Sequence, residues 1–236
     1  NMDYLKNVIL VLILTGFGIH LYTQQVYKSK YNIVKHVFRQ GKYIVYEIKN
    51  ILSKEECLLV INEARPDLKR SGIMSKEGVS NIRTSTNTFL HKQKVKQKKI
   101  TNILDKIDTI TEKLSGKPKE NQEPLQVVNY AKGQEYKEHY DCCVPLNSTI
   151  CKNDRNRLGL RHSTFLIYLN DVERGGETYF PNLNYKFKPT TGNAIFFFNL
   201  TRAEDSFNEF SKHAGLPTDH DKWVCNKWIR TQEYIM

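Results

Sequence analysis

Apolar residues in the first half of the chain recur three and four positions apart at two places, the spacing of an amphipathic helix. The first predicted helix begins after Ser53, because Ser53 and Glu56 have the spacing of a capping box, and Pro66 ends it. The second has a lysine-rich opposite face and ends near Gly116 and Pro118. Its apolar positions are Ile100, Ile103, Leu104, Ile107, Ile110 and Leu114.

From Glu123 onward the pattern changes to short runs of β-branched and aromatic residues, which are typical of strands. Turn signals such as Gly175-Gly176 and Thr191-Gly192 separate the runs. Helices followed by many antiparallel strands predict a mainly β protein of the α+β class. We expect a double-stranded β-helix (jelly-roll) core braced by N-terminal α-helices. The predicted strands are 125–130, 164–169, 194–198 and 223–229.

The N-terminal segment is almost purely apolar from Val8 to Tyr22, with Lys6 before it and Lys28 after it. It is shorter than the about 20 residues of a full membrane span, and no clean small-residue cleavage site follows it. We predict an N-terminal membrane anchor of the signal-anchor type at 1–28, a basic connector at 29–44 and one catalytic domain at 45–236. By the positive-inside rule the basic connector would keep the domain cytoplasmic, so topology and cleavage stay open.

The formal net charge of +11 and the pI near 9.3 would suit a polyanionic partner. However, the lysines gather in the connector and in the run 92–99, without the interleaved aromatic residues that stack on bases. We therefore expect no nucleic-acid partner.

The five cysteines are an odd number, so a complete intramolecular disulfide framework is excluded. Either Cys142 or Cys143 could pair with Cys151 in an oxidising compartment, whereas the cluster lacks the histidines of a zinc site. Sequons begin at Asn147 and Asn199, and each would accept a glycan only if it is luminal and exposed. The cysteines are Cys57, Cys142, Cys143, Cys151 and Cys225.

A candidate metal site begins with His139 and Asp141, which are two residues apart. In a strand this spacing places both side chains on one face. A third ligand must come from a distant strand, and His213 is the best-placed candidate. Two histidines and one carboxylate form the facial triad of non-haem iron(II) oxygenases, which leaves adjacent coordination positions open for co-substrate and oxygen.

Five stretches around these ligands strengthen the metal interpretation. Two of them contain sequence motifs: 126–141 includes Tyr-x-x-Gly-Gln-x-Tyr, and 222–230 includes Lys-Trp-x-x-Asn-Lys-Trp. Together with 164–172, 175–181 and 213–217, they resemble the prolyl 4-hydroxylase family over nearly the whole chain after about residue 45.

The resemblance implies that His139, Asp141 and His213 hold iron(II), which binds 2-oxoglutarate as co-substrate and dioxygen. Ascorbate is expected to rescue iron that becomes oxidised in uncoupled turnovers. The reaction would hydroxylate proline in a peptide or protein while 2-oxoglutarate is decarboxylated to succinate and carbon dioxide. An enzyme of this type in the endoplasmic reticulum would carry a luminal catalytic domain on its membrane anchor.

The far carboxylate of 2-oxoglutarate needs a cation, and the resemblance assigns Lys222 to it as a catalytic residue. The hydroxyls of Tyr130 and Thr164 would hydrogen-bond the same carboxylate. In the family this lysine usually lies one position further from the distal histidine, so the turn between Pro217 and Lys222 is expected to be shortened.

The family's substrate groove corresponds to six positions of this chain, and the aromatic ones offer flat faces to proline rings. Residues 142–160 would form a loop at the entrance that closes over the peptide. The alternative function is a non-catalytic, membrane-tethered jelly-roll module that binds extended peptides or glycans. Oligomeric state stays open. The six substrate positions are Arg83, Ser85, Glu123, Tyr136, Arg161 and Trp228.

Overall fold

The computed structural model describes residues 33–34, 45–72 and 82–235. The predicted anchor at 1–28 and nearly all of the predicted connector at 29–44 lie outside the described residues. None of the helices in the described ranges combines the length and the apolar character needed to cross a membrane.

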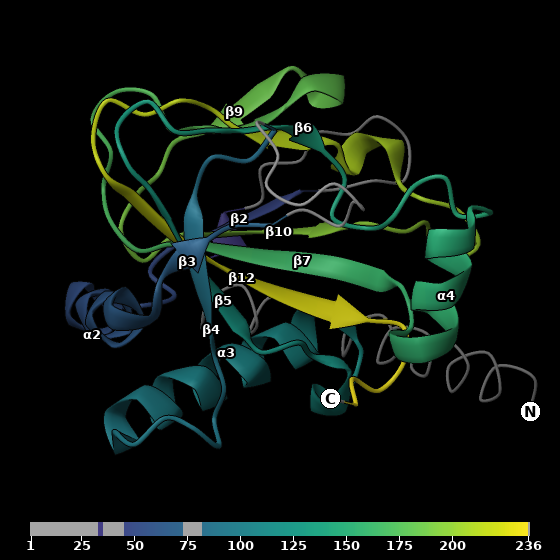
Figure 1. Ribbon diagram of the computed structural model, residues 1–236, viewed down its shortest axis with the longest axis horizontal. Coiled ribbons are helices and arrows are strands. Elements are labelled where there is room, and N and C mark those ends of the chain that lie inside the picture. Colours follow the sequence, from purple (N-terminus) through teal and green to yellow (C-terminus); the bar gives the residue numbers. More distant parts are fainter. Residues whose placement is uncertain (1–32, 35–44, 73–81, 236) are drawn as a thin grey trace, which may run out of the picture.

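Two antiparallel sheets form the body of the protein and confirm the predicted mainly β, jelly-roll architecture (Figure 1). The larger sheet has the strand order β1-β2-β10-β7-β12-β5-β4-β3, and the smaller sheet has the order β6-β11-β8-β9. The strands are β1 (Ile33–Val34), β2 (Tyr46–Ile48), β3 (Lys69–Arg70), β4 (Thr86–Leu90), β5 (Leu125–Tyr130), β6 (Tyr136–His139), β7 (Arg161–Tyr168), β8 (Thr178–Phe180), β9 (Tyr185–Phe187), β10 (Ala194–Phe198), β11 (His213–Gly215) and β12 (Lys222–Arg230).

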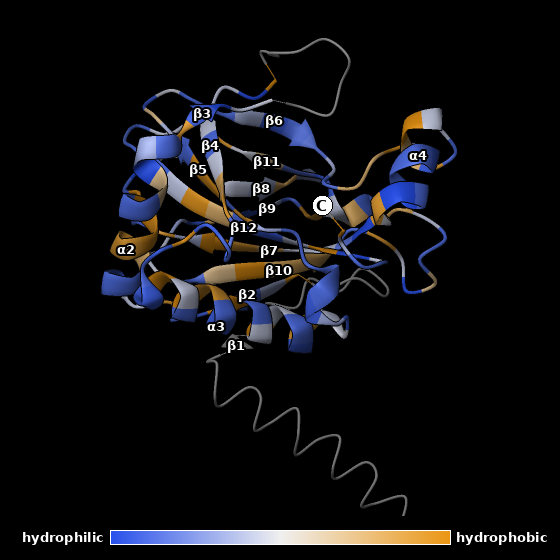
Figure 2. Ribbon diagram, turned by 60° about the horizontal axis from the view of Figure 1, so that its bottom comes forward, coloured by the Kyte–Doolittle hydropathy of each residue, from blue (hydrophilic) through white to orange (hydrophobic). Residues whose placement is uncertain are grey.

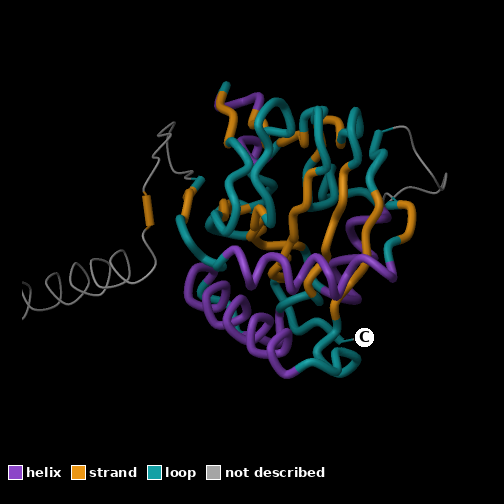
Figure 3. Tube along the Cα trace, turned by 90° about the vertical axis from the view of Figure 1, so that its left-hand side faces the viewer, coloured by secondary structure: helices purple, strands orange, loops and turns teal. Residues whose placement is uncertain are grey.

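Helices α2 (Lys54–Ala64) and α3 (Lys98–Ser115) brace the larger sheet, as predicted, and Figure 3 shows them lying side by side across it. The capping box at the start of α2 is confirmed. The Glu56 amide donates to the Ser53 hydroxyl at 3.1 Å, and the Ser53 amide donates to the Glu56 carboxylate at 2.8 Å. Short 3-10 helices lie at Arg65–Asp67, Lys119–Asn121, Pro181–Leu183 and Glu209–Ser211.

Alternating residues of the larger sheet enter two separate hydrophobic cores. On β10, Phe196 packs under the helices with Ile107, whereas its neighbour Phe197 faces the smaller sheet with Phe180. Figure 2 shows the apolar strands β7 and β10 in the middle of the molecule, with α2 and α3, which alternate between polar and apolar residues, on one side of them. Burying each such side chain contributes about 1.5–3 kcal/mol, so both faces of the larger sheet hold the fold together. The second core lies beside the site described below.

The segment predicted as an entrance loop at 142–160 contains a helix instead, α4 (Thr149–Leu158). The Ser148 hydroxyl caps it by accepting the Cys151 amide at 3.3 Å, and Gly159, with φ 71°, ends it. Among its residues only Cys151 is buried. The helix was missed because it has no apolar stripe, so hydrophobic spacing could not reveal it.

Candidate metal centre and pocket

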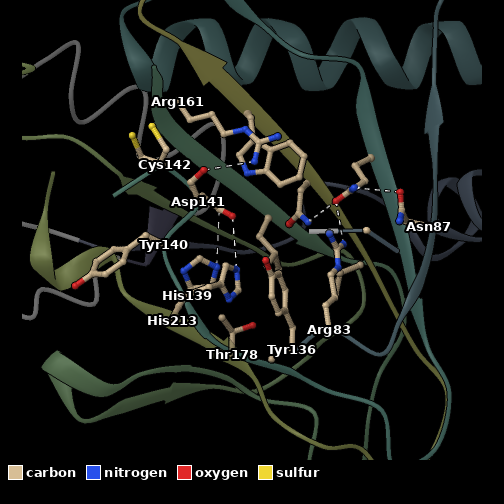
Figure 4. Close-up of a pocket in the computed structure, with 18 of the residues that line it drawn as sticks. Arg83, Asn87, Tyr136, His139, Tyr140, Asp141, Cys142, Arg161, Thr178 and His213 are labelled. Atoms are coloured by element: carbon tan, nitrogen blue, oxygen red, sulfur yellow. Dashed lines mark hydrogen bonds and ion pairs between the residues drawn. The ribbon is translucent and has the colours of Figure 1, made fainter. Parts of the chain in front are cut away.

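A pocket of about 580 Å³ lies at the inner face of the larger sheet and reaches the smaller sheet (Figure 4). Its floor comes from β12, where alternate residues from Lys222 to Trp228 line it. Its walls come from β4, β5, β6, β7 and β11 and from the segment around α4. This volume lies within the usual range for small-molecule and cofactor sites.

The three predicted metal ligands meet inside this pocket. His139, the last residue of β6, and His213, the first residue of β11, are direct partners across the two strands. Their Nε2 atoms lie 3.7 Å and 3.8 Å from the two carboxylate oxygens of Asp141. One ligand atom from each residue falls within 4.8 Å of the other two, so a single ion could be bound by all three.

Both histidines are held with the same ring nitrogen toward the carboxylate. Nδ1 of His139 lies 2.8 Å from the Lys137 carbonyl oxygen, and Nδ1 of His213 lies 2.8 Å from the Ser211 carbonyl oxygen. A carbonyl oxygen can only accept, so each Nδ1 carries a proton, and in the neutral ring Nε2 then keeps a free lone pair. This is the outer-shell arrangement usual for metal-binding imidazoles.

The charge states of the cluster also suit a metal. Burial alone would raise the pKa of the Asp141 carboxyl, but His213 and His139 hold that pKa well below its usual range. Burial, together with the neighbouring His139, lowers the pKa of His213 to about 4. At neutral pH the site therefore offers an ionised carboxylate and a neutral imidazole, which are the forms that bind metals.

The reason predicted for the convergence of His139 and Asp141 is wrong in one respect. Strand β6 ends at His139, and Asp141 lies in the bend that follows it. The two side chains therefore do not share one strand face. Instead, the Thr164 hydroxyl of the neighbouring β7 donates to the Asp141 carboxylate at 2.7 Å and fixes it from behind.

Lys222 is a buried cation without an anionic partner. It is 2% exposed, and no carboxylate of the described residues lies within 4 Å of its ammonium. Burial lowers its pKa to about 7, which Glu177 partly offsets. Buried charges are normally paired, so this ammonium, in the same pocket as the metal ligands, fits an anion such as the far carboxylate of 2-oxoglutarate.

Two hydroxyls accompany Lys222, but only one of them was predicted. Tyr130 is the direct cross-strand partner of Lys222. A Cβ on Gly215 would lie 3.6 Å from both the Lys222 ammonium and the Tyr130 hydroxyl, so a glycine leaves room where they converge. The second hydroxyl is that of Thr178, which lines the pocket and accepts a hydrogen bond from Tyr168 at 2.8 Å. Its own proton remains available for an anion.

The predicted role of Thr164 at the far carboxylate is wrong. Thr164 pairs with Trp228 on β12, six residues along that strand from Lys222. At about 3.3 Å per residue this is roughly 20 Å. Thr164 is fully buried and does not line the pocket. The missed residue, Thr178, follows the Gly175-Gly176 turn, within a stretch that already supported the family resemblance.

Arg161 and Trp228 form one wall of the pocket. The Arg161 guanidinium lies 3.4 Å from the centre of the Trp228 ring. Glu123 holds it through hydrogen bonds of 2.7 Å and 2.9 Å, and Arg230 donates to the same carboxylate at 2.7 Å. Glu123 was predicted in the substrate groove, but it does not line the pocket and instead fixes Arg161. The indole Nε1 of Trp228 is buried without a hydrogen-bond partner among the described residues.

Arg83 and Tyr136 form the opposite wall. The Arg83 guanidinium lies 4.9 Å from the centre of the Tyr136 ring, and that ring stacks on His139 at 3.5 Å. Arg83 is oriented by hydrogen bonds to the Ser85 hydroxyl at 3.1 Å and to Gln126 at 3.2 Å. Ser85 is fully buried and does not line the pocket, so its predicted place at the groove surface is also wrong.

The entrance of the pocket is apolar, and a disulfide lies beside it. Val144, Ile150 and Phe89 line the pocket although they are 39%, 49% and 39% exposed. Cys143 pairs with Cys151, with 5.6 Å between their Cα atoms, which resolves the predicted choice of partners.

The two sequons differ in accessibility. Asn147 is exposed beside the entrance, whereas Asn199 is fully buried with its amide nitrogen bonded to Thr164. The condition stated for a glycan acceptor, an exposed side chain, is therefore not met by Asn199 in the folded chain. Asn147 remains open to modification.

Comparison with known proteins agrees with this geometry. Residues 125–230 match the family model of the 2OG-Fe(II) oxygenase superfamily. A putative prolyl 4-hydroxylase of Acanthamoeba polyphaga mimivirus is 36% identical over 191 residues, which are 80% of this chain and 75% of that protein. A probable prolyl 4-hydroxylase of Arabidopsis thaliana is 34% identical, covering 78% of this chain and 68% of that protein.

A similar solved structure is that of the viral collagen prolyl hydroxylase of Paramecium bursaria Chlorella virus 1 in its 2OG complex. It aligns with a TM-score of 0.62 and 30% identity, over 81% of this chain and 98% of that chain. The likeness therefore extends over most of the chain.

Proposed function

Because the chain belongs to the prolyl 4-hydroxylase family of the 2OG-Fe(II) oxygenases, we propose that it hydroxylates proline residues in peptides or proteins. It is an iron(II)- and 2-oxoglutarate-dependent oxygenase. The observation that carries the proposal is the convergence of His139, Asp141 and His213 in the same pocket as the unpaired ammonium of Lys222. That pocket offers a metal site and an anion site together.

Each part of the pocket has a separate task in this proposal. Bound iron(II) would supply the oxidative chemistry, with 2-oxoglutarate and dioxygen consumed and succinate and carbon dioxide formed. His139, Asp141 and His213 would hold the metal from one side. Lys222 and Tyr130 would bind the far carboxylate of 2-oxoglutarate. The protein itself would position the reactants and exclude water, because the cofactor supplies the oxidative chemistry.

We expect the affinity for 2-oxoglutarate to fall as the pH rises above about 7. The ammonium of Lys222 must be charged to bind a carboxylate, and its pKa in the free pocket is lowered to about 7 by burial. Below that pH the ammonium is already charged, whereas above it each bound ligand must bring in a proton. The apparent Kd should therefore increase about tenfold per pH unit.

Titration calorimetry of the manganese(II)-loaded protein between about pH 6 and about pH 9 measures this dependence. Lys222→Met should bind weakly with little dependence on pH. A wild-type Kd that stays constant across the range would contradict the assignment of Lys222.

The walls of the pocket suit an extended, proline-containing peptide. A proline has no backbone N–H, so its peptide segment offers mainly carbonyl acceptors. The Arg161 guanidinium, which lies over the Trp228 ring, is a donor on one wall. We expect Trp228 to act mainly by positioning this guanidinium, because Arg161 lies over one face of its ring. The apolar entrance formed by Val144, Ile150 and Phe89 would contact the residues beside the target proline.

Trp228→Phe is expected to weaken peptide binding while leaving 2-oxoglutarate binding intact. The substitution keeps an aromatic ring but a smaller one, so the contact that positions Arg161 weakens, and cation–π contacts contribute about 0.5–2 kcal/mol. The chain has two tryptophans, and Trp223 is buried in the core on the opposite face of β12. In zinc-loaded protein, a proline-rich peptide should shift the indole N–H resonance of Trp228 and leave that of Trp223 in place. An unshifted Trp228 resonance would refute this role.

The proposed reaction is tested with a panel of peptides incubated with iron(II), 2-oxoglutarate and ascorbate. Each proline peptide is matched to one in which alanine replaces the target proline. Fragment mass spectrometry should place one added oxygen on proline, and the alanine peptides should remain unmodified. Oxygen on another residue type would redirect the assignment. The alternative of a non-catalytic peptide- or glycan-binding module is not favoured, because the relatives are prolyl hydroxylases and the metal ligands are assembled.

We also propose that residues 1–28 tether the domain to the membrane of the endoplasmic reticulum, with residues 45–236 in the lumen. The apolar run Val8 to Tyr22 supports the tether. The disulfide between Cys143 and Cys151 supports an oxidising compartment. Glycosidase-sensitive modification of Asn147 in cells would agree with this location, and carbonate-extractable, unmodified protein would argue against it.

A further inference from the structure

Two buried side chains behind Asp141 form a hydrogen-bond relay that ends on its carboxylate. The Thr164 hydroxyl donates to Oδ2 of Asp141 at 2.7 Å, and the amide nitrogen of Asn199 donates to the Thr164 hydroxyl oxygen at 2.9 Å. Thr164 and Asn199 are both fully buried, and neither lines the pocket. They therefore contact neither substrate nor metal directly.

The direction of this relay follows from the donors and acceptors themselves. An ionised carboxylate only accepts, so the single proton of the Thr164 hydroxyl must go to Asp141. Thr164 then has only an acceptor left for Asn199, which must present its NH₂ rather than its oxygen. Oδ1 of Asn199 is in fact buried without a hydrogen-bond partner among the described residues. An unpaired buried oxygen is unfavourable, and the chain tolerates it at this position.

Backbone hydrogen bonds hold Asn199 in place independently of Thr164. The backbone N–H of Asn199 donates to the His162 carbonyl at 2.8 Å, and the backbone carbonyl of Asn199 accepts the Asn208 N–H at 2.8 Å. Asn199 directly follows β10, whereas Thr164 lies within β7, and these strands are paired. Two adjacent strands of the larger sheet thus aim one directed relay at a single carboxylate oxygen.

We propose that Thr164 and Asn199 are positioning residues that hold the Asp141 carboxylate in one orientation, leaving Oδ1 as the oxygen that binds the metal. This inference rests on the proposed function, because it takes Asp141 to be a metal ligand. Each carboxylate oxygen lies near one histidine Nε2, Oδ1 at 3.7 Å from His139 and Oδ2 at 3.8 Å from His213, but only Oδ2 also accepts the Thr164 hydroxyl. A carboxylate free to turn could bind a metal through both oxygens and would fill one of the positions that a facial triad keeps open.

The test compares Thr164→Val with Thr164→Ser by manganese(II) titration, without peptide or oxygen. Valine keeps the shape of threonine and removes the hydroxyl, so we expect metal affinity to fall about 10- to 100-fold, as for other outer-shell partners. Serine keeps the hydroxyl, so its affinity should stay close to that of wild type. A packing role predicts the opposite order, because serine loses the methyl group. A valine variant with wild-type affinity would overturn the proposal.

A second variant tests the contribution of Asn199 and does not depend on the stability of Thr164→Val. Asn199→Leu removes the donor to Thr164 together with the unpaired oxygen, so metal affinity should fall at least about twofold. Thermal stability should rise or stay unchanged, because the substitution also removes an unpaired buried oxygen. In the Thr164→Val background the leucine substitution should have no further effect on metal affinity. Equal losses in both backgrounds would show that Asn199 does not act through Thr164.

The absorption band of the anaerobic iron(II)–2-oxoglutarate complex gives an independent readout. Thr164→Val should shift or weaken this band, and Thr164→Ser should restore it. These measurements involve no proline substrate. If Thr164→Val loses metal affinity and the wild-type protein hydroxylates no proline, the relay is supported and the proposed substrate is refuted. If the wild-type protein hydroxylates proline and Thr164→Val keeps the metal affinity of wild type, only the relay is refuted.

Discussion

His213→Ala is expected to abolish proline hydroxylation, with a loss larger than the about 100-fold that outer-shell substitutions can cause. The imidazole is held by the Ser211 carbonyl and stacks against Phe180, and alanine provides no ligand atom in its place. Removing it leaves two ligands for the ion and an ionised, buried Asp141 carboxylate. Manganese(II) titration should show the same loss as turnover, because the defect lies in metal binding.

His162 provides a matched control for this substitution. It is also a buried histidine of the larger sheet, 8% exposed, but its Nε2 faces Glu204 at 3.7 Å and it lies outside the pocket. His162→Ala should lower thermal stability while metal affinity stays near that of wild type. Full turnover by His213→Ala, or equal losses of metal affinity in both variants, would contradict the assignment of the triad.

Lys222→Met is expected to weaken 2-oxoglutarate binding strongly and to leave metal binding intact. Methionine fills a similar volume without the charge, so the ligand carboxylate would be buried beside Tyr130 without a cation. Removing one partner of a buried charge pair costs about 2–5 kcal/mol, which is roughly 30- to 4,000-fold in Kd. Calorimetric titration of 2-oxoglutarate into the manganese(II)-loaded variant measures this loss.

Lys227, on the same strand, is the matched control. It is buried like Lys222, but it faces α3 and pairs with Asp108 at 2.8 Å. Lys227→Met should lower thermal stability and leave the Kd of 2-oxoglutarate unchanged. A Lys222→Met protein that binds 2-oxoglutarate as tightly as wild type would show that the far carboxylate is held elsewhere.

Features that depend on short stretches of sequence were predictable. The capping box of Ser53 and Glu56 and the apolar stripe of α3 specify their helices locally, and the runs of β-branched and aromatic residues specify the strands. The metal ligands His139, Asp141 and His213 could be proposed because the residues around them resemble a known family. The pocket confirms that these three side chains converge.

Features that depend on how strands align were not predictable. Strand alternation correctly places Thr164 on the inner face of the sheet, but only the register against β12 shows that it lies opposite Trp228 instead of Lys222. For the same reason the sequence could not show that Glu123 supports Arg161 from behind. The helix α4 escaped prediction because its polar surface carries no periodic signal.

We expect one pocket to couple consumption of 2-oxoglutarate to oxidation of proline through the metal held by His139, Asp141 and His213. The most direct test is to count succinate released and hydroxylated proline formed in the same reaction, with iron(II) present and after its removal by a chelator. We predict one succinate for each hydroxyproline with iron(II), and neither product without it. Iron-loaded protein that forms neither succinate nor hydroxyproline with any proline peptide, or that hydroxylates without consuming 2-oxoglutarate, would contradict this account.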